Sequence, residues 1–509
     1  MVDSDLVEFV TRSLRDDTRE TFERRVDEQA DRLRDALRGT TLDSPGFGLG
    51  IELEAYAIDE AGRLARVPEQ VLAGPCAREL GVHNVELNTV PDRFDDAGIA
   101  EQERKLRRAL ERTRAIAREH DAEVVADAMW TTPPTEGTAA YLGDVEEADG
   151  VTVARNMTGS PRYHAIDNHI VDEVGGAVSL EVPGVERAFP TILFESLTCS
   201  IQPHLQVPEA ASFPRYYNAA LATLPPVLAL STNAPLLPPD LYGDDTVADP
   251  DALLEETHHE LRIPVFEASV NGAWEKARVP NRIDRPTDVV DRLVADPTCA
   301  PVLREWVAEG GRETFGDRFW ELDHKRGTYW RWVRAVAGGQ PVGRGDRRSI
   351  RLEYRPLPTQ PTIDDSIALL CLVVGLVHGL VVADHPAIAL ERDEIERGFY
   401  DAAANGLEAD VPWRTADGEP TTDPDAIYDE AFALARRGLR DRGVSAERID
   451  AAIGAFEDRW ERRRTPSRWK LERVRERLEA GATFDDAVRG MQAAYVDRSG
   501  AGTPFSEWP

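Results

Sequence analysis

The fold is decided by the stretch GLGIELEAYAID at residues 48–59, in which apolar and polar side chains alternate. Successive side chains of a β-strand point to opposite faces of the sheet. Ile51 and Leu53 therefore share one face, and Glu52 and Glu54 share the other. Such alternation is typical of an antiparallel sheet that buries one face, so the stretch predicts a strand with one dry face and one acidic face.

Three further stretches follow the same pattern: HNVELNTVP at 83–91, CSIQPHLQVP at 199–208 and RSIRLEYRP at 348–356. Contact with water would explain the polar face of any single strand. Taken together, the four faces hold acids, amides, histidine and arginine rather than the mixed Lys, Thr and Ser of an ordinary solvated sheet. If the strands share one sheet, the carboxylates on these faces converge. The side chains assigned to the polar faces are Glu52, Glu54, Tyr56, Asn84, Glu86, Asn88, Gln202, His204, Gln206, Arg351, Glu353 and Arg355.

Glutamates that converge on one surface repel one another unless cations lie between them. Hard carboxylate oxygens suit Mg²⁺ or Mn²⁺ bound together with substrate phosphates. Arginine supplies forked donors for carboxylate or phosphate oxygens. A concave sheet that carries both kinds of side chain is suited to ATP chemistry.

The motifs of these strands resemble those of glutamate–cysteine ligase family 2, which includes bacterial carboxylate–amine ligases and γ-glutamylcysteine synthetases. The matches follow one order over about residues 46–390, and jointly they are fairly specific. They are GIELEAY (50–56), NVELNTVPD (84–92), SPRYHAIDNHI (160–170), LTCSIQPHLQV (197–207), VLALSTNAPL (227–236), YWRWVRAV (329–336) and SIRLEYRPL (349–357).

The resemblance implies an α+β, glutamine-synthetase-like catalytic domain, in which a curved antiparallel sheet with flanking helices surrounds ATP and Mg²⁺. It also implies the reaction. ATP phosphorylates the γ-carboxylate of glutamate, and the amine of cysteine then displaces phosphate, as in γ-glutamylcysteine biosynthesis. The acyl phosphate formed on the way must be shielded from water.

The resemblance further implies roles for individual residues. Two interpretations of Asn233 stay open: it could bind the nucleotide or hold a loop. The candidate metal or phosphate ligands are Glu52, Glu54, Glu86, His204 and Glu353. The candidate nucleotide-binding residues are Gln202, Arg262 and Asn233, and the candidate catalytic arginines, which would grip phosphate or the substrate carboxylate, are Arg334, Arg351 and Arg355.

Three parts are expected along the chain. Residues 1–45 have the apolar spacing of helices, residues 46–395 form the catalytic domain, and residues 396–509 form an acidic helical extension. The charge-free stretch at 367–383 is expected to be a buried helix rather than a membrane span, opened by a capping box at Thr362. Residues 136–158 show little periodicity and are interpreted as a loop or lid.

The amino-acid composition restricts the class of protein, its partners and its expected cellular environment. The chain has 509 residues, with 60 Lys plus Arg against 92 Asp plus Glu, for a net charge of −32. Lysine occurs only at 105, 276, 325 and 470, and none of the four follows glycine, which excludes a P-loop. The acid excess predicts a halophilic, salt-adapted host and argues against a nucleic-acid partner. The acidic N-terminus and four dispersed cysteines predict a cytoplasmic protein with reduced thiols.

Three departures from the family pattern leave the identity of the amine and carboxylate substrates open. The usual NSP appears as Asn233-Ala234-Pro235, Arg351 precedes the E-x-R motif, and the C-terminal extension exceeds the common core. The first alternative is the same ATP-dependent chemistry with another amine or carboxylate. The second is a catalytically silent scaffold that docks partners on its C-terminal helices. The oligomeric state and the number of metal ions stay open.

Overall fold

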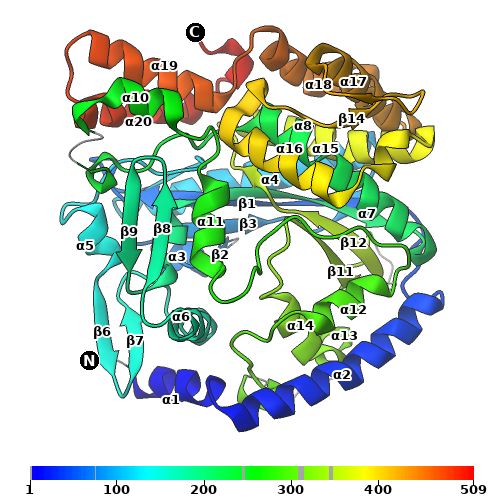
Figure 1. Cartoon of the computed structure of the whole chain (residues 1–509), viewed down its shortest axis with the longest axis horizontal. Coiled ribbons are helices and arrows are strands. Elements are labelled where there is room, and N and C mark those ends of the chain that lie inside the picture. Colours follow the sequence, from blue (N-terminus) through cyan, green and yellow to red (C-terminus); the bar gives the residue numbers. More distant parts are fainter. Residues whose placement is uncertain (1–2, 75, 244–246, 308–313, 343–347) are drawn as a thin grey trace.

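The computed structural model describes residues 3–74, 76–243, 247–307, 314–342 and 348–509. At its centre lies a curved antiparallel sheet whose strands differ in length (Figure 1). Its main strand order is β11-β12-β10-β1-β3-β2, and every pairing is antiparallel. The predicted α+β class is confirmed. The strands of this sheet are β1 Gly48–Ile58, β2 Cys76–Arg78, β3 Asn84–Asn88, β4 Asp92–Arg93, β5 Glu123–Val125, β10 Ser200–Val207, β11 Val333–Gly339, β12 Ser349–Tyr354 and β13 Leu357–Pro358.

The four strands expected from the alternating pattern are β1, β3, β10 and β12, and they lie together in this sheet. Their apolar side chains point into the main core; these include Ile51, Leu87, Ile201 and Leu352, each no more than 2% exposed. The opposite parity carries the acids, amides and arginines. The predicted division into a dry face and a polar face is therefore confirmed, since side chains alternate along each strand.

Helices cover the apolar face of the sheet. They are α4 Asp96–Arg118, α7 Phe213–Ala222, α8 Leu224–Ser231 and α15 Ile363–Ala383. The side chain of Thr362 accepts a hydrogen bond from the backbone N–H of Asp365 and so caps α15. In the described part of the chain α15 alone is long and apolar enough to cross a membrane, and it is mostly buried. The prediction of a buried core helix is confirmed.

Helices on the polar side of the sheet enclose a space over it. The three that line this space are α6 Pro161–Glu173, α11 Arg262–Val270 and α14 Trp320–Arg326. Helix α2 Asp16–Arg38 packs on the outer side of α14, where Arg25 and Gln29 hydrogen-bond to Glu321. The remaining helices on this side are α1 Ser4–Ser13, α12 Asp288–Ala295 and α13 Phe315–Arg318, with η4 Arg304–Trp306.

The interpretation of residues 136–158 as a loop or lid is wrong. The segment forms a short helix, α5 Thr138–Leu142, and a two-stranded hairpin of β6 Val145–Ala148 and β7 Val151–Ala154. Each strand has only four residues, too few for alternation to stand out from the acidic background. A second hairpin, β8 Val178–Val182 with β9 Val185–Phe189, follows it. Short elements nearby are α3 Glu69–Leu72, η1 Ile192–Leu197, η2 Ala210–Ser212, η3 Pro239–Leu241 and α10 Pro250–Glu256.

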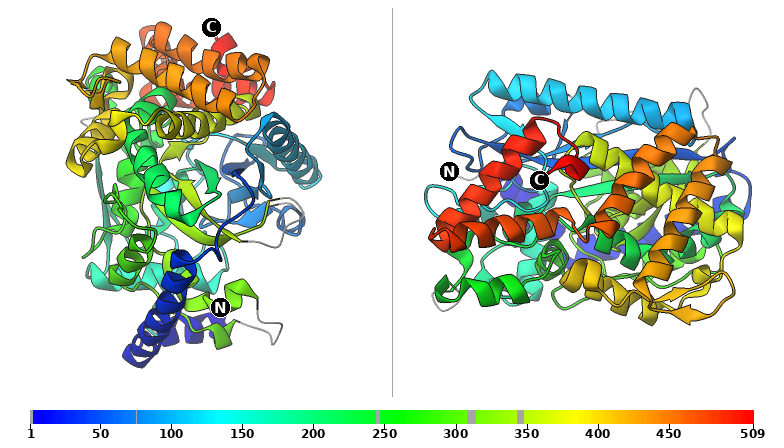
Figure 2. Two further views of the ribbon diagram at one scale, coloured as in Figure 1. Left: turned by 90° about the vertical axis from the view of Figure 1, so that its right-hand side faces the viewer. Right: turned by 90° about the horizontal axis from the view of Figure 1, so that it is seen from above.

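The C-terminal region is helical and forms a layer against the rest of the molecule (Figure 2). Helix α17 packs against α15, and both belong to the main hydrophobic core. The boundary predicted near residue 395 stays a prediction. The elements are η5 Pro386–Ala389, α16 Arg392–Asn405, η6 Gly406–Glu408, β14 Trp413–Arg414, β15 Pro420–Thr421, α17 Pro424–Asp441, α18 Ala446–Glu461, α19 Pro466–Glu479, α20 Phe484–Gly500 and η7 Phe505–Glu507.

Two buried ion pairs tie this layer to the sheet domain. Lys470 on α19 lies 2.5 Å from Asp127, and both side chains are at most 1% exposed. Arg459 on α18 pairs with Asp365 at the start of α15. All four cysteines are buried and free, as predicted.

Candidate active site

A cavity of about 500 Å³ opens on the polar face of the sheet, between strands β1 and β10 and helices α6, α11 and α14. Aromatic side chains, including Phe266, Trp320 and Trp332, form part of its wall. The structure brings seven of the predicted site residues to this one cavity. They are Glu52, Glu54, Glu86, Gln202, Arg262, Arg334 and Arg355.

A smaller cavity of about 240 Å³ adjoins the first at Glu52. It is lined by two more predicted residues, His204 and Arg351. Gly48 and Gly50 also line it, at positions where a side chain would project onto the polar face. The two cavities together extend along the polar face of β1 and β10.

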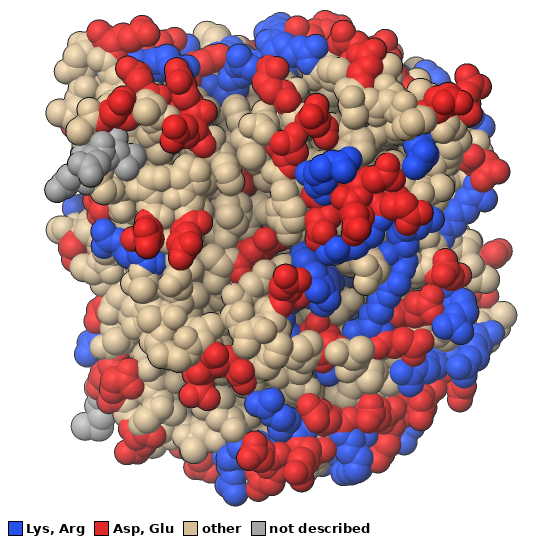
Figure 3. All heavy atoms as spheres, in the orientation of Figure 1, with Lys and Arg blue, Asp and Glu red and all other residues tan. Residues whose placement is uncertain are grey.

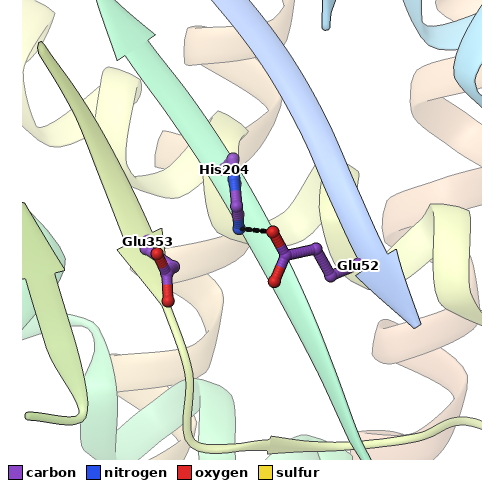
Figure 4. Close-up of side chains that lie close together, drawn as sticks. All are labelled: Glu52, His204 and Glu353. Atoms are coloured by element: carbon purple, nitrogen blue, oxygen red, sulfur yellow. Dashed lines mark ion pairs between the residues drawn. The ribbon is translucent and has the colours of Figure 1, made fainter. Parts of the chain in front are cut away.

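Three predicted ligands form a cluster on adjacent strands: Glu52 on β1, His204 on β10 and Glu353 on β12 (Figure 4). The register places His204 directly opposite Glu353. The Nε2 atom of His204 lies 3.4 Å from Oε1 of Glu52, and it is buried without a hydrogen-bond partner. One ligand atom from each residue lies within 4.8 Å of the others.

The electrostatics of this cluster favour a neutral imidazole between two carboxylates. Burial and the charge of Arg351 hold the pKa of His204 well below its usual value. Burial and the neighbouring charge of Glu353 raise the pKa of Glu52. Burial alone would also raise the pKa of Glu353, but the guanidiniums of Arg334 and Arg355 outweigh it and hold that pKa well below the usual range.

A second acidic cluster, formed by Glu54, Glu79 and Glu86, lies beside the first. Glu54 on β1 faces Glu86 on β3 in the strand register. Burial together with the charge of Glu54 raises the pKa of Glu79 to about 7. Burial together with Glu79 and Glu52 raises the pKa of Glu86 well above its usual value. Among the described residues, no lysine or arginine forms an ion pair with Glu54, Glu79 or Glu86.

The predicted arginines surround Glu353. Arg334 on β11 lies 2.6 Å from Oε1 of Glu353, and Arg355 lies 2.8 Å from the same oxygen. Arg355 also donates to Oε1 of Gln202 at 3.1 Å. Guanidinium groups thus stand beside the acidic clusters, an arrangement suited to holding phosphate between metal ions and arginine.

Glu353 belongs to the cluster with Glu52 and His204 but lines neither cavity. Asn233 also lines neither cavity. It is fully buried, and its Nδ2 donates to the backbone oxygen of Thr359 at 2.7 Å and to the hydroxyl of Tyr495 at 2.9 Å. Lys470 donates to its backbone oxygen. At this position Asn233 joins the C-terminal helices to the sheet domain and is not in reach of a ligand in the cavity.

Other residues of the cavity were missed at the sequence level. Glu79 follows a strand of only three residues, and Glu195 lies on the short helix η1, so neither belongs to a long alternating strand. Arg326 and Asp323 lie on α14, which the strand pattern does not describe. Only the motif SPRYHAIDNHI at 160–170 pointed to α6, whose Arg162 and Tyr163 line the cavity.

The side chains present fit divalent cations bound with phosphate. Each cluster offers hard oxygen ligands, and the buried, neutral His204 offers an unused ring nitrogen. The raised pKa values of Glu52, Glu79 and Glu86 reflect charge that a cation would neutralise.

Residues 48–498 match the model of the glutamate–cysteine ligase family 2, and this match includes all the candidate ligands. The chain belongs to this family. The resemblance recognised in the motifs is therefore confirmed, and as a family member the chain is an ATP-dependent carbon–nitrogen ligase. The match also extends through α17, α18 and α19 into α20.

Three solved structures are similar to this glutamate–cysteine ligase family member, and the first supports a common fold. A glutamate–cysteine ligase from Francisella tularensis, solved in complex with AMP, has 14% sequence identity and a TM-score of 0.51, over 91% of this chain and 94% of that one. A bifunctional glutathione synthetase from Pasteurella multocida has 12% identity and a TM-score of 0.44, over 92% and 54% of the two chains. A complex of the ubiquitin-like protein Pup with its ligase PafA has 12% identity and a TM-score of 0.36, over 90% and 74%. Among curated protein sequences, none matches this chain.

Proposed function

We propose that this protein joins the γ-carboxylate of glutamate to the amine of cysteine, with ATP as the energy source and an acyl phosphate as the intermediate. One observation carries the proposal: two acidic clusters and their arginines lie side by side on the polar face of the sheet, at a cavity with aromatic side chains in its wall. This arrangement serves phosphoryl transfer to a carboxylate better than hydrolysis, because the aromatic wall limits the access of water.

Metal ions fit the proposal. Mg²⁺, or Mn²⁺, would be held by Glu52, His204 and Glu353 in one cluster and by Glu54, Glu79 and Glu86 in the other. The ions would neutralise the charge that develops on the transferred phosphoryl group. Without them the five carboxylates of the two clusters would repel an approaching phosphate.

The chain's own residues would act as follows. Arg334 and Arg355, in contact with Glu353, hold the transferred phosphoryl group by forked hydrogen bonds. A glutamate γ-carboxylate oxygen attacks the γ-phosphorus and ADP leaves. The acceptor nitrogen then attacks the acyl carbon, the carbon–oxygen bond breaks, and phosphate leaves with an oxygen of the carboxylate while the nitrogen gives up a proton.

The aromatic wall protects the intermediate. Phe266 packs against Trp332, with ring centroids 5.4 Å apart, and the indole N–H of Trp332 is anchored to Glu267 at 2.8 Å. A wall fixed in this way keeps bulk water from the acyl phosphate until the amine arrives.

The alternatives predict different results. The same chemistry with another amine or carboxylate would leave the acidic clusters unchanged and alter only the aromatic end of the cavity. A catalytically silent scaffold would gain nothing from five clustered carboxylates that repel one another, and the clusters therefore argue against it.

The test is ADP release by the purified protein with Mg²⁺ and ATP in molar KCl. We expect release to require both glutamate and cysteine. If ADP release required glutamate and a different amine, that amine would replace cysteine as the proposed acceptor. No release with any carboxylate and amine of a broad panel, from protein shown to be folded, would overturn the proposal.

A further inference from the structure

Six arginines line the large cavity, and five of them are paired with a carboxylate. Among the described residues, Arg162 alone in this set has no ion-pair or hydrogen-bond partner. Its Nε is buried and unsatisfied. The paired arginines are Arg78 with Glu69, Arg262 with Glu260, Arg326 with Asp323, and Arg334 and Arg355 with Glu353.

The structure leaves a specific space for the guanidinium of Arg162. Arg162 lies in the first turn of α6, and its guanidinium rests over Gly327 at the end of α14. A Cβ at position 327 would overlap Nη2 of Arg162. Gly327 has φ of −62°, an ordinary helical value, so the backbone does not require glycine there. The missing side chain instead leaves room for the guanidinium.

The surroundings of Arg162 are aromatic. Trp320 stacks on His324, with ring centroids 5.2 Å apart and planes 15° apart, and both residues line the cavity together with Trp330. His324 is neutral at physiological pH, because burial lowers its pKa to about 4. A partly desolvated guanidinium in such a place costs free energy, which a ligand carboxylate would recover through forked hydrogen bonds.

The two organic substrates of the proposed reaction differ in the charged groups that are available for recognition by the protein. The glutamate donor carries an α-ammonium as well as an α-carboxylate, so it needs partners of both signs. Glu195 and Arg262 suit it: the carboxyl of Glu195 has no partner among the described residues, and Arg262 is close enough to act on its charge. The acceptor must keep its amine free to attack, which leaves its carboxylate and its side chain for recognition.

We propose that Arg162 binds the α-carboxylate of the amine acceptor, so that the acceptor is an α-amino acid whose side chain lies against Trp320 and Trp330. This inference rests on the proposed ligase function and deepens it. It makes Arg162 a specificity-determining residue and Gly327 the residue that makes room for it. Cysteine satisfies the requirement, whereas cysteamine, the same thiol amine without a carboxylate, does not.

The experiment compares kcat/KM for cysteine with kcat/KM for cysteamine, at saturating ATP and glutamate, in the full-length protein. We expect Arg162→Met to lower the cysteine-to-cysteamine ratio on the order of 10- to 100-fold, the value of hydrogen bonds to a charged group. Arg162→Lys should restore part of the ratio. The KM values for glutamate and ATP should stay near those of the unmodified protein.

Gly327→Ala provides a second variant that keeps the charge and the helical backbone. The new methyl group should displace the flexible end of Arg162 and lower the same ratio, with an unchanged unfolding temperature. Arg112→Met is the matched control, because Arg112 is exposed on α4, away from the cavity. Its ratio should equal that of the unmodified protein.

The outcomes separate the inference from the function on which it rests. An active ligase whose cysteine-to-cysteamine ratio is unaffected by both Arg162→Met and Gly327→Ala would overturn the inference. So would a rise in the KM for glutamate with no change in the ratio, since Arg162 would then bind the donor. Absence of turnover in the unmodified protein with any amine would instead overturn the proposed function.

Discussion

Glu86 shows how the cavity holds its charge. Three carboxylates, Glu54, Glu79 and Glu86, present oxygens within 4.8 Å of one another, and burial with its neighbours raises the pKa of Glu86 well above its usual value. Asn88 is the one partner that donates to its side chain among the described residues, at 2.9 Å. A buried acidic side chain of this kind destabilises the metal-free protein, and cation binding would offset that loss of stability.

We therefore predict opposite effects of Glu86→Gln on activity and on stability. Turnover should fall on the order of 100-fold or more, because a ligand of the metal and phosphate site is lost. The unfolding temperature without metal should stay the same or rise, because one repelling charge is gone. The measurements are steady-state ADP release and thermal unfolding with EDTA.

Glu186→Gln is the control, since Glu186 is exposed on the hairpin strand β9. It should leave both quantities unchanged. Full turnover in Glu86→Gln would contradict the role given to this acidic cluster.

Asp167 gives a prediction for the pH dependence of stability. This side chain is fully buried on α6; Oδ1 accepts from the backbone N–H of Ile192 at 2.8 Å, while Oδ2 has no partner. Burial raises its pKa to about 7, despite that hydrogen bond. Between its unfolded pKa near 4 and about 7, the folded protein holds a proton that the unfolded chain has lost, so stability falls as pH rises.

Asp167→Asn removes this titration. We expect the variant to gain stability relative to the unmodified protein as pH goes from 5 to 7, by up to about 1.4 kcal/mol per pH unit. Denaturant unfolding at the two pH values measures the difference. Asp172→Asn, an exposed change on the same helix, should show no such gain. An identical pH dependence in Asp167→Asn and the unmodified protein would show that Asp167 does not carry the effect.

The sequence predicted the direction of site side chains only where a regular strand fixed it, and the family motifs supplied other residues, such as Arg334, without a direction. Alternation along long strands correctly indicated that Glu52, Glu54, His204 and Glu353 share the polar face. It could not indicate Glu195, which lies on a short 3₁₀ helix, or the pairing of Arg334 with Glu353, which depends on the register of two strands. Asn233 came from a motif alone, and a motif carries no information on which way a side chain points.

At the scale of elements, helices α19 and α20 are held to the sheet domain by polar contacts as well as by apolar packing. Asp127 accepts from Lys470 at 2.5 Å on one oxygen and from Gln492 of α20 at 2.8 Å on the other. Asn233 completes the network. Buried polar groups of this kind are costly to leave unpaired.

We predict that Lys470→Met destabilises the protein by about 3–5 kcal/mol, because it leaves the charge of Asp127 buried and uncompensated. The double variant Asp127→Asn with Lys470→Met should recover part of this loss, since no charge is then left alone. Denaturant unfolding gives both values. Arg440→Met, an exposed change on α17, serves as the surface control. A loss below about 1 kcal/mol in Lys470→Met would mean that the pair does not hold the helices in place.

Element lengths explain what could be predicted at this scale. Helices α4 and α15 have 23 and 21 residues, enough for their periodicity or their apolar run to be recognised. The β6–β7 hairpin has four residues in each strand and was therefore interpreted as a loop. The order of strands in the sheet depends on contacts between residues far apart in the chain, which local patterns do not contain.

For the whole molecule, the net charge of −32 is the dominant feature. Acidic and arginine side chains mix over the face shown in Figure 3, and many form ion pairs, yet the acids remain in large excess. Unscreened, this excess destabilises the compact state by repulsion. We propose that the protein is adapted to concentrated salt.

We expect the unfolding temperature to rise between 0.1 and 1 M KCl, as the Debye length shortens from about 10 Å to about 3 Å. Thermal unfolding at several KCl concentrations, with glycerol as a neutral co-solute control, measures this. An unfolding temperature that is constant or falls with KCl would contradict the proposed adaptation.

In the proposed reaction, the site on the polar face of the sheet activates the carboxylate of glutamate with ATP and transfers the acyl group to an amine. The most direct measurement follows oxygen from glutamate labelled with ¹⁸O in its γ-carboxylate, in a reaction with ATP, Mg²⁺ and cysteine in molar KCl. An acyl-phosphate intermediate requires one labelled oxygen in each phosphate released, and we predict that result. Phosphate released without label, in step with ADP, would contradict the account, because the carboxylate would then never have been phosphorylated.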